Sequence, residues 1–265
     1  MEKRRNVLRE LIDEGKPTIG THVHSMWPGI AEVIGHAGTM DYIEFSGEYA
    51  PYDLFSLENF GRAIDLFPEM TSMIKIDQEP RTYISVRAIG SGIQNLLFTD
   101  VRNVADAKEC VRAARAETPE EGGVVGVGMR RDVGYVLGAG SEAYVQQLRA
   151  GVVALLIEKA GAIENLEEIL SVEGVDMIQF GPADYAMSIG KPGQFGDPAV
   201  RGAHERAIAA AMERGIRPRV ELASFEQAKP WIDMGIRDFC VGWDVRVIYQ
   251  FCRREGEELA KLLGR

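Results

Sequence analysis

The sequence predicts a parallel α/β barrel, and three observations support this fold class. Short apolar runs of strand length alternate with helical segments along the chain, and eight such strand–helix units can be counted. Each run is apolar on both faces, as expected for a parallel sheet covered by helices. The 265 residues are a normal length for eight units closed into a barrel. We therefore expect residues 1–265 to form a single domain, a (β/α)8 TIM barrel with an extra N-terminal helix.

Local signals justify the elements of the first half of the chain. Strands are expected at residues 17–24, 41–45, 72–76 and 94–99, and helices at 7–14, 28–38, 54–66, 81–89 and 104–116. Gly38 closes the second helix and Pro68 ends the third. The fifth helix is amphipathic, because Val104, Ala107 and Val111 share one face.

The second half repeats the pattern after one segment that is hard to interpret. Residues 119–140 are rich in glycine, and we expect them to form a loop over the barrel mouth that carries Arg130 and Arg131. Strands follow at 152–157, 177–180, 217–222 and 238–241, and helices at 141–150, 166–170, 199–214, 225–234 and 245–263. An open Rossmann-type sheet is the structural alternative, but no G-x-G-x-x-G motif follows the first strand.

The composition excludes several classes of partner. A net charge of −10 and a pI near 5.1 argue against nucleic acid or an anionic membrane, although an anionic small substrate stays compatible. The three cysteines show neither metal nor disulfide spacing, which indicates a reducing compartment. The chain starts with a polar helix rather than a signal segment, and no apolar run reaches the roughly 20 residues that span a bilayer. We expect a cytoplasmic protein.

Two carboxylates end neighbouring predicted strands. An apolar strand runs into the turn Gly181-Pro182-Ala183-Asp184, and Glu158 ends the strand one unit earlier, 26 residues before Asp184. The carboxyl ends of barrel strands form the site face of this fold, so the two side chains can converge. Oxygen ligands with open positions suit Mg²⁺ or Mn²⁺. The alternative is a pair of acids bound to loop cations.

These residues lie in motifs that resemble those of a known family. Ile157-Glu158 followed by Gly181 to Gly190 (GPADYAMSIG) resembles the HpcH/HpaI aldolase family, metal-dependent class II pyruvate aldolases related to citrate lyase β-subunit-like enzymes. Further similarity covers nearly the whole chain, at Gly47-Glu48 with Ala50-Pro51, at 87–101 and at 241–244. The Gly-Pro-Ala-Asp string with a correctly spaced upstream glutamate is the most specific part.

The resemblance implies a site and a chemistry. Glu158 and Asp184 would bind a divalent cation, Mg²⁺ or Mn²⁺ first and Co²⁺ as a third candidate. Gly181, Pro182 and Ala183 would present backbone groups to the carboxylate of a 2-oxo acid, and Leu222 would line the pocket. The cation would stabilise the enolate of that 2-oxo acid, with an aldehyde as the second partner. The family's last helix is exchanged between subunits, which implies a homo-oligomer: a dimer, trimer or hexamer.

Positions near the expected metal depart from the family pattern. Tyr49 replaces the histidine of the family's D-G-E-H-A-P turn, and Lys75 replaces an arginine at the end of the third strand. Tyrosine is a poor base at neutral pH but a plausible acid. Lysine keeps the positive charge but loses the bidentate guanidinium fork, and it could donate a proton if its pKa were depressed.

Other candidates come from the first strand and the helices. His22 and His24 lie two apart on the strand and point the same way, so one of them, His24 above all, could take over the role of base. The alternative is that one packs in the barrel and the other is a hydrogen bonder. Trp27 is a candidate pocket wall. His204, on a helix, is expected at the surface, and Glu221 is expected to point away from the pocket because its neighbour Leu222 faces it.

The leading hypothesis is a carbon–carbon lyase that cleaves or forms a hydroxylated 2-oxo acid. Glu158 and Asp184 would hold the cation, Lys75 would help to bind the enolate oxygen, and Tyr49 or His24 would move the proton. A first alternative uses the same scaffold for a decarboxylation, a dehydration or a condensation on another carboxylate substrate. A second alternative, from a different class, is a catalytically weak barrel that acts as a binding protein.

Overall fold

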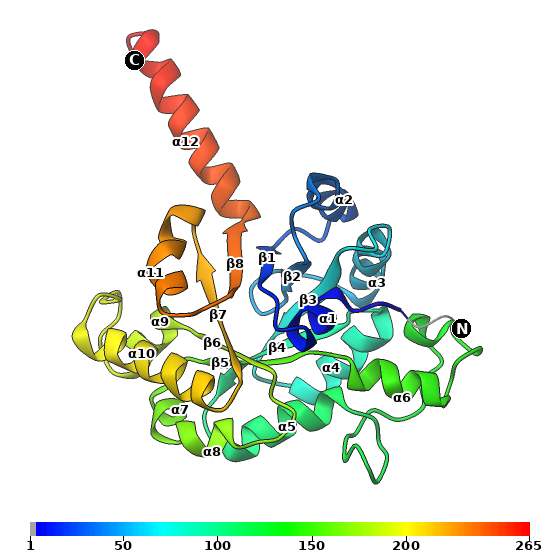
Figure 1. Cartoon of the computed structure of the whole chain (residues 1–265). Coiled ribbons are helices and arrows are strands. Elements are labelled where there is room, and N and C mark those ends of the chain that lie inside the picture. Colours follow the sequence, from blue (N-terminus) through cyan, green and yellow to red (C-terminus); the bar gives the residue numbers. More distant parts are fainter. Residues whose placement is uncertain (1–3) are drawn as a thin grey trace.

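A computed structural model describes residues 4–265 of the chain. Eight parallel strands close into a barrel in chain order, as Figure 1 shows. The strands are β1 (Thr18–Val23), β2 (Tyr42–Ser46), β3 (Thr71–Ile76), β4 (Asn95–Val101), β5 (Val153–Ile157), β6 (Met177–Phe180), β7 (Arg217–Leu222) and β8 (Asp238–Trp243). The predicted TIM barrel is therefore confirmed, with every expected strand in place.

Twelve α-helices accompany the strands in the described residues, and all but the last pack against the barrel. They are α1 (Val7–Asp13), α2 (Pro28–Ala37), α3 (Leu54–Ile64), α4 (Arg81–Ser91), α5 (Val104–Ala114), α6 (Glu142–Arg149), α7 (Ala160–Glu164), α8 (Leu166–Leu170), α9 (Pro182–Ser188), α10 (Pro198–Glu213), α11 (Ala228–Asp233) and α12 (Asp244–Leu262). The short helices α7 and α9 were not expected from the sequence. Helix α9 begins directly after β6 and contains Asp184, which the sequence had suggested to lie in a turn.

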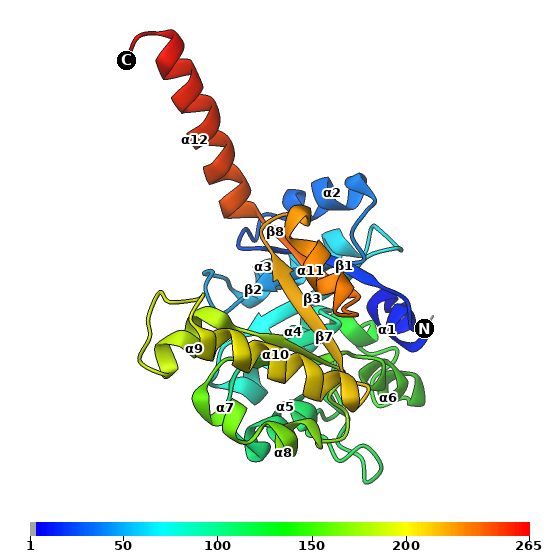
Figure 2. The same ribbon diagram turned by 60° about the vertical axis from the view of Figure 1, so that its left-hand side comes forward.

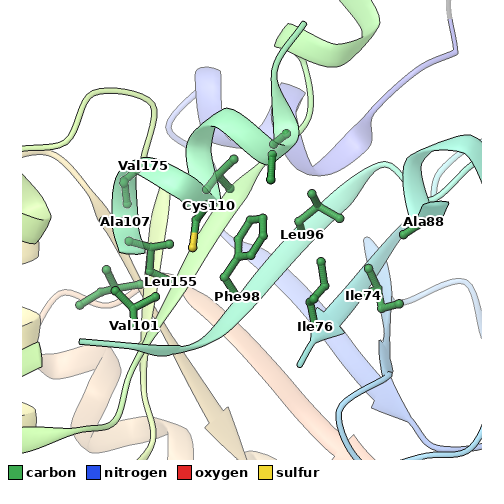
Figure 3. Close-up of a cluster of buried hydrophobic side chains, with 14 of the residues drawn as sticks. Ile74, Ile76, Ala88, Leu96, Phe98, Val101, Ala107, Cys110, Leu155 and Val175 are labelled. Atoms are coloured by element: carbon green, nitrogen blue, oxygen red, sulfur yellow. The ribbon is translucent and has the colours of Figure 1, made fainter. Parts of the chain in front are cut away.

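Alternation along the strands separates two buried layers. Ile74 and Ile76 of β3 and Leu155 of β5 point outward and pack with the helix layer, as Figure 3 shows around Cys110. Met73 of β3 and Leu156 of β5 belong to a separate cluster that contains Leu8 of α1. Because side chains alternate between faces, Lys75 and Glu158, two residues beyond Met73 and Leu156, point inward at the carboxyl ends of their strands.

The glycine-rich segment 119–140 does not reach the barrel mouth, so that expectation is wrong. Arg130 donates a hydrogen bond to the carbonyl of Val86 in α4, and Arg131 pairs with Asp65 at the end of α3. Neither arginine lines the cavity described below. The physical reason is topological: the helix after a barrel strand returns the chain to the opposite end of the barrel, and the segment follows α5.

Helix α12 projects away from the barrel in both views (Figures 1 and 2). None of its residues is buried, and it exposes a set of large apolar side chains: Val245, Val247, Ile248, Tyr249, Phe251, Leu259 and Leu262. Within residues 4–265, no helix combines the length and the apolar character that crossing a bilayer requires.

Candidate active site

A large cavity opens at the carboxyl ends of the strands, and it has a volume of about 720 Å³. All the site residues predicted from the sequence except Trp27 line it: His24, Tyr49, Lys75, Glu158, Gly181, Pro182, Ala183, Asp184 and Leu222. Trp27 precedes α2, is 66% exposed and lies outside this lining. A pocket-wall role for Trp27 has no support from this geometry.

Glu158 lines the cavity and is almost fully buried, at 2% exposure. Its Oε1 accepts a hydrogen bond of 2.9 Å from the backbone N–H of Asp100. Gly181 leaves room on the other side, since a Cβ there would lie 2.6 Å from Glu158 Oε2. Burial raises the pKa of Glu158 to about 7, and the nearby charge of Asp184 acts in the same direction. The site therefore needs more positive charge to keep this carboxylate ionised.

Three carboxylates meet at this point and form what we call the acid centre: Glu48, Asp100 and Glu158. One oxygen from each lies within 4.8 Å of the others. Asp100 adopts a positive φ of 54°, a conformation that costs about 1 kcal/mol or more for a residue other than glycine. This backbone turn at the end of β4, beside a register irregularity after Phe98, places the Asp100 N–H against Glu158.

Asp184 is connected to the acid centre through a lysine. Lys159 Nζ lies 2.9 Å from Asp184 Oδ1 and 2.6 Å from Asp100 Oδ1. The predicted pair Glu158 and Asp184 thus borders the same cavity, but in this arrangement Asp184 is bound to a side-chain cation. Lys159 was not a candidate in the sequence-based prediction. Asp100 follows its predicted strand at the same end of the barrel as Glu158, but it was not predicted to be a metal ligand.

The donor set fits a hard divalent cation. It contains only carboxylate oxygens, as Mg²⁺ and Mn²⁺ prefer. Among residues 4–265, no lysine or arginine forms an ion pair with the buried Glu158, whose pKa is raised, whereas Glu48 and Asp184 are each paired with a lysine. Glu158 and Asp184, with Glu48 and Asp100 beside them, are the residues that would hold the ion.

Lys75 and Tyr49 form the next part of the cavity wall. Lys75 Nζ lies 2.6 Å from Glu48 Oε2 and donates a hydrogen bond of 2.9 Å to the Tyr49 hydroxyl oxygen. Burial lowers the pKa of Lys75, but the contacts with the Tyr49 hydroxyl and the Glu48 carboxylate outweigh burial and raise it. Lys75 therefore stays protonated and is a weaker acid than an ordinary lysine, whereas proton donation by this residue was expected to need a lowered pKa. Burial raises the pKa of Tyr49 to about 12, so its hydroxyl is neutral at physiological pH.

The two histidines of β1 have different surroundings. His22 is buried, and its Nδ1 lies 3.7 Å from Glu221 Oε1 and 4.0 Å from Cys240 Sγ. The His24 ring lies 5.0 Å from the Trp243 ring and 5.9 Å from the Tyr49 ring, centroid to centroid. Burial, followed by the charge of His22, lowers the pKa of His24. Within the described chain, His24 Nε2 is buried without a hydrogen-bond partner, so a neutral ring can accept a proton there.

Glu221 faces the cavity, contrary to the sequence-based expectation. Its Oε2 accepts a hydrogen bond of 3.2 Å from Gln179 Nε2. Arg219, two residues earlier on β7, also points into the barrel and pairs with Glu44 at 2.5 Å. Leu222 borders the cavity but packs in the outer cluster with Val220. The expectation was wrong because it assumed, from the family resemblance, that the Leu222 side chain points into the pocket and that its neighbour Glu221 therefore points away.

His204 is not a surface residue, which corrects a second expectation. Its ring stacks on Phe180 at 4.6 Å and lies 4.6 Å from the ring of Trp231, centroid to centroid. Burial lowers the pKa of His204 to about 4. The buried residues Val200 and Ala207 of α10 lie four before and three after His204, so the helical spacing could have placed it on the inner face.

Three comparisons connect this geometry to known proteins. Residues 20–228 match the family model described as HpcH/HpaI aldolase/citrate lyase. The 4-hydroxy-2-oxo-heptane-1,7-dioate aldolase of Escherichia coli is 30% identical to the chain over 98% of the chain and 95% of the aldolase.

Solved structures are also similar over nearly the whole chain. A HpcH/HpaI aldolase/citrate lyase family protein from Burkholderia cenocepacia has a TM-score of 0.87 and 27% identity, covering 96% of this chain and 99% of that one. The citrate synthase SbnG, with a TM-score of 0.85 and 18% identity over 98% of this chain and all of its own, shares the fold.

Proposed function

Because the chain belongs to the HpcH/HpaI aldolase/citrate lyase family, we propose that it cleaves or forms a hydroxylated 2-oxo acid as a metal-dependent aldolase. The observation that carries the proposal is the buried carboxylate of Glu158, which lines the cavity together with Lys75 and meets the carboxylates of Glu48 and Asp100. A small 2-oxo acid is the proposed substrate, with an aldehyde as second product or acceptor.

The proposed ligands of the cation are Glu158 and Asp184, and Mg²⁺ or Mn²⁺ is the proposed ion. When bound, the cation would supply Lewis-acid stabilisation of the negative charge that develops on the 2-oxo acid. Lys75 stays protonated beside Glu48 and adds a second positive charge. The backbone at Gly181, Pro182 and Ala183 borders the cavity and is proposed to receive the substrate carboxylate.

Proton transfer is assigned to His24 and Tyr49. In the cleavage direction, the bond between carbons 3 and 4 breaks and its electron pair forms the enolate, while the 4-hydroxyl loses its proton as the aldehyde forms. His24 Nε2, buried without a partner in the described chain, takes that proton as general base. The neutral Tyr49 hydroxyl then gives a proton to carbon 3 of the enolate as general acid.

We further propose that the protein works as a homo-oligomer in the cytoplasm. Helix α12 buries none of its residues against its own barrel, although Ile248, Phe251 and Leu259 lie on one face. An apolar face of this kind marks an interaction site, and a second copy of the chain would cover it. Three free cysteines, Cys110, Cys240 and Cys252, suit a reducing compartment.

A cleavage assay tests the proposed function. A 4-hydroxy-2-oxo acid is incubated with protein and Mg²⁺ or Mn²⁺, and released pyruvate is measured through lactate dehydrogenase. We expect pyruvate release that EDTA abolishes and that Glu158→Gln lowers at least about a hundredfold. Glu173→Gln, a matched change at an exposed glutamate, should retain the wild-type rate. Release that continues unchanged in EDTA and in Glu158→Gln would refute the proposal.

A further inference from the structure

The cavity extends beyond the acid centre toward α10 and α11. Both helices lie on the left of Figure 1, on the side of the barrel where β6 and β7 end. Four rings line this extension, which we call the aromatic lobe: Phe180, Phe195, His204 and Trp231. At 720 Å³ the whole cavity is much larger than a three-carbon 2-oxo acid requires.

The aromatic lobe is built around His204. The ring stacks on Phe180 with an interplanar angle of 15° and leans on Trp231 at 40°. No hydrogen bond joins the ring nitrogens to another residue in the described part of the chain, and burial lowers the pKa of His204 to about 4. His204 is therefore neutral at physiological pH and contributes an aromatic surface rather than a positive charge.

The charges at the rim of the lobe are balanced. Arg201 and Glu205 are exposed, border the cavity, and lie four residues apart on α10, where such side chains are neighbours. Both charges lie at the exposed rim rather than among the aromatic walls. Lys75, which lines the cavity, is already paired with Glu48, and the nearby Lys159 is paired with Asp100. The lobe thus has aromatic walls and no buried, unpaired cation among its lining residues.

We infer that the aromatic lobe binds the aldehyde half of the substrate and that this aldehyde carries a neutral aromatic group instead of a second carboxylate. The inference rests on the proposed aldolase function and adds the substrate class. A flat ring can stack against Trp231 and Phe195, whereas a terminal carboxylate among these rings would lose its hydration with no buried cation beside it, since Arg201 lies at the exposed rim. By contrast, the similar Escherichia coli protein is named for a heptane-1,7-dioate, a substrate with carboxylates at both ends.

The reaction in the synthetic direction is an aldol addition. Carbon 3 of the pyruvate enolate forms a bond to the carbonyl carbon of the aldehyde, and the carbonyl oxygen takes a proton to become the 4-hydroxyl. Stacking of the aldehyde ring in the aromatic lobe would hold its carbonyl carbon toward the acid centre, because both are parts of one cavity.

The test compares two acceptors, benzaldehyde and succinic semialdehyde, in aldol addition to pyruvate with the Mn²⁺-loaded full-length protein. We expect kcat/KM for benzaldehyde to exceed that for succinic semialdehyde by at least about tenfold. Trp231→Ala should lower the benzaldehyde value about ten- to a hundredfold. Phe195→Ala, at a side chain that is 54% exposed and lies outside the buried core, should lower it severalfold. Phe225→Ala, at a 77% exposed ring outside the cavity lining, is the control.

Deuterium exchange into the pyruvate methyl group distinguishes a failure of the substrate inference from a failure of the proposed aldolase function. The exchange reports enolate formation without an aldehyde, and both lobe variants should keep it at the wild-type rate. If wild-type protein exchanges deuterium but prefers succinic semialdehyde, or if neither lobe variant changes the preference, the inference is overturned and the aldolase function stands. If wild-type protein neither exchanges deuterium nor adds either aldehyde, both the proposed function and this inference fall.

Discussion

Two lysines pair with the carboxylates at and beside the acid centre, and each pairs with different ones. Lys75 pairs with Glu48 at 2.6 Å, whereas Lys159 lies between Asp100 and Asp184 at 2.6 and 2.9 Å. A divalent cation held by Asp184 would therefore have to displace Lys159 or bind beside it. Glu158 has no lysine within ion-pair distance and is free to bind the cation directly, as far as residues 4–265 show.

Replacement of Lys159 tests this competition. Lys159→Met removes a positive charge next to the proposed ligands, so we expect the Kd for Mn²⁺, measured by calorimetry, to fall about tenfold. Lys191→Met is the matched control, since Lys191 pairs with Asp197 at 2.7 Å and does not border the cavity. Weaker Mn²⁺ binding in Lys159→Met would mean that Lys159 supports the site instead of competing for it.

The assigned proton donor has its own test. Tyr49→Phe keeps the ring but removes the hydroxyl that accepts from Lys75, and we expect the cleavage kcat to fall about a hundredfold while pyruvate still binds. Tyr83→Phe, at a 55% exposed ring on α4, serves as the control. A Tyr49→Phe variant with the wild-type kcat would remove Tyr49 from the mechanism.

At the scale of single residues, the sequence predicts several of the side chains that meet at the site, but it does not predict all of their hydrogen bonds and ion pairs. Lys75, Glu158 and Asp184 were identifiable because each follows an apolar strand or lies in a family motif. The role of Asp100 depends on a positive φ of 54°, and nothing in the surrounding residues signals that backbone turn. The contacts of Lys159 could not be predicted either, because its two partners, Asp100 and Asp184, come from different barrel units.

At the scale of elements, apolar runs predicted all eight strands, but the facing of one strand and the path of one loop were wrong. Glu221 faces inward with Arg219, as alternation along β7 requires once Arg219 pairs with Glu44 inside the barrel. That ion pair joins β7 to β2, and a pairing between strands so distant in sequence cannot be read from either segment alone. The loop 119–140 lies away from the mouth because it follows a helix rather than a strand.

Helix α10 supplies a prediction about pH. His204 has a pKa of about 4 in the folded protein against an ordinary histidine pKa of 6.5, so the unfolded chain binds more protons between these pH values. Stability should therefore fall as pH decreases from 6.5 to 4, by up to roughly 3 kcal/mol from this residue, and should gain nothing from it above 6.5. His204→Phe, which keeps the aromatic stack, should flatten this part of the profile measured by urea unfolding.

A matched change at His36 controls for the pH dependence of the rest of the protein. His36 is exposed and contacts Phe67 edge-on, so His36→Phe should leave the slope between pH 4 and 6.5 as in the wild type. A wild-type slope that persists in His204→Phe would show that the stacked ring is not the group responsible.

At the scale of the whole molecule, the barrel is closed, but the apolar side chains of the last helix remain exposed. Strands β1 to β8 close on one another, and the buried layers account for the apolar residues of the strands. Helix α12 instead extends away from the barrel (Figure 2) and exposes Ile248, Phe251 and Leu259 at 61, 58 and 57%. This surface supports the proposed assembly of several copies.

The assembly can be measured by light scattering after size exclusion. We expect a mass of at least twice the 29.3 kDa of one chain, and Phe251→Glu should shift it toward the single-chain value because a charge cannot be buried in an apolar interface. Gln250→Glu adds the same charge on the opposite face of α12 and should leave the mass unchanged. A wild-type protein that elutes as a single chain at micromolar concentration would contradict the proposal.

The central claim is that the buried Glu158 supports cation-dependent formation of a 2-oxo acid enolate. The most direct measurement is deuterium exchange into the methyl group of pyruvate, followed by proton NMR with Mg²⁺ or Mn²⁺ and again in EDTA. We predict exchange that requires the added cation and is lost in Glu158→Gln, with Glu173→Gln behaving as the wild type. Exchange that persists in EDTA and in Glu158→Gln, or a wild-type protein that shows no exchange with either cation, would contradict the claim.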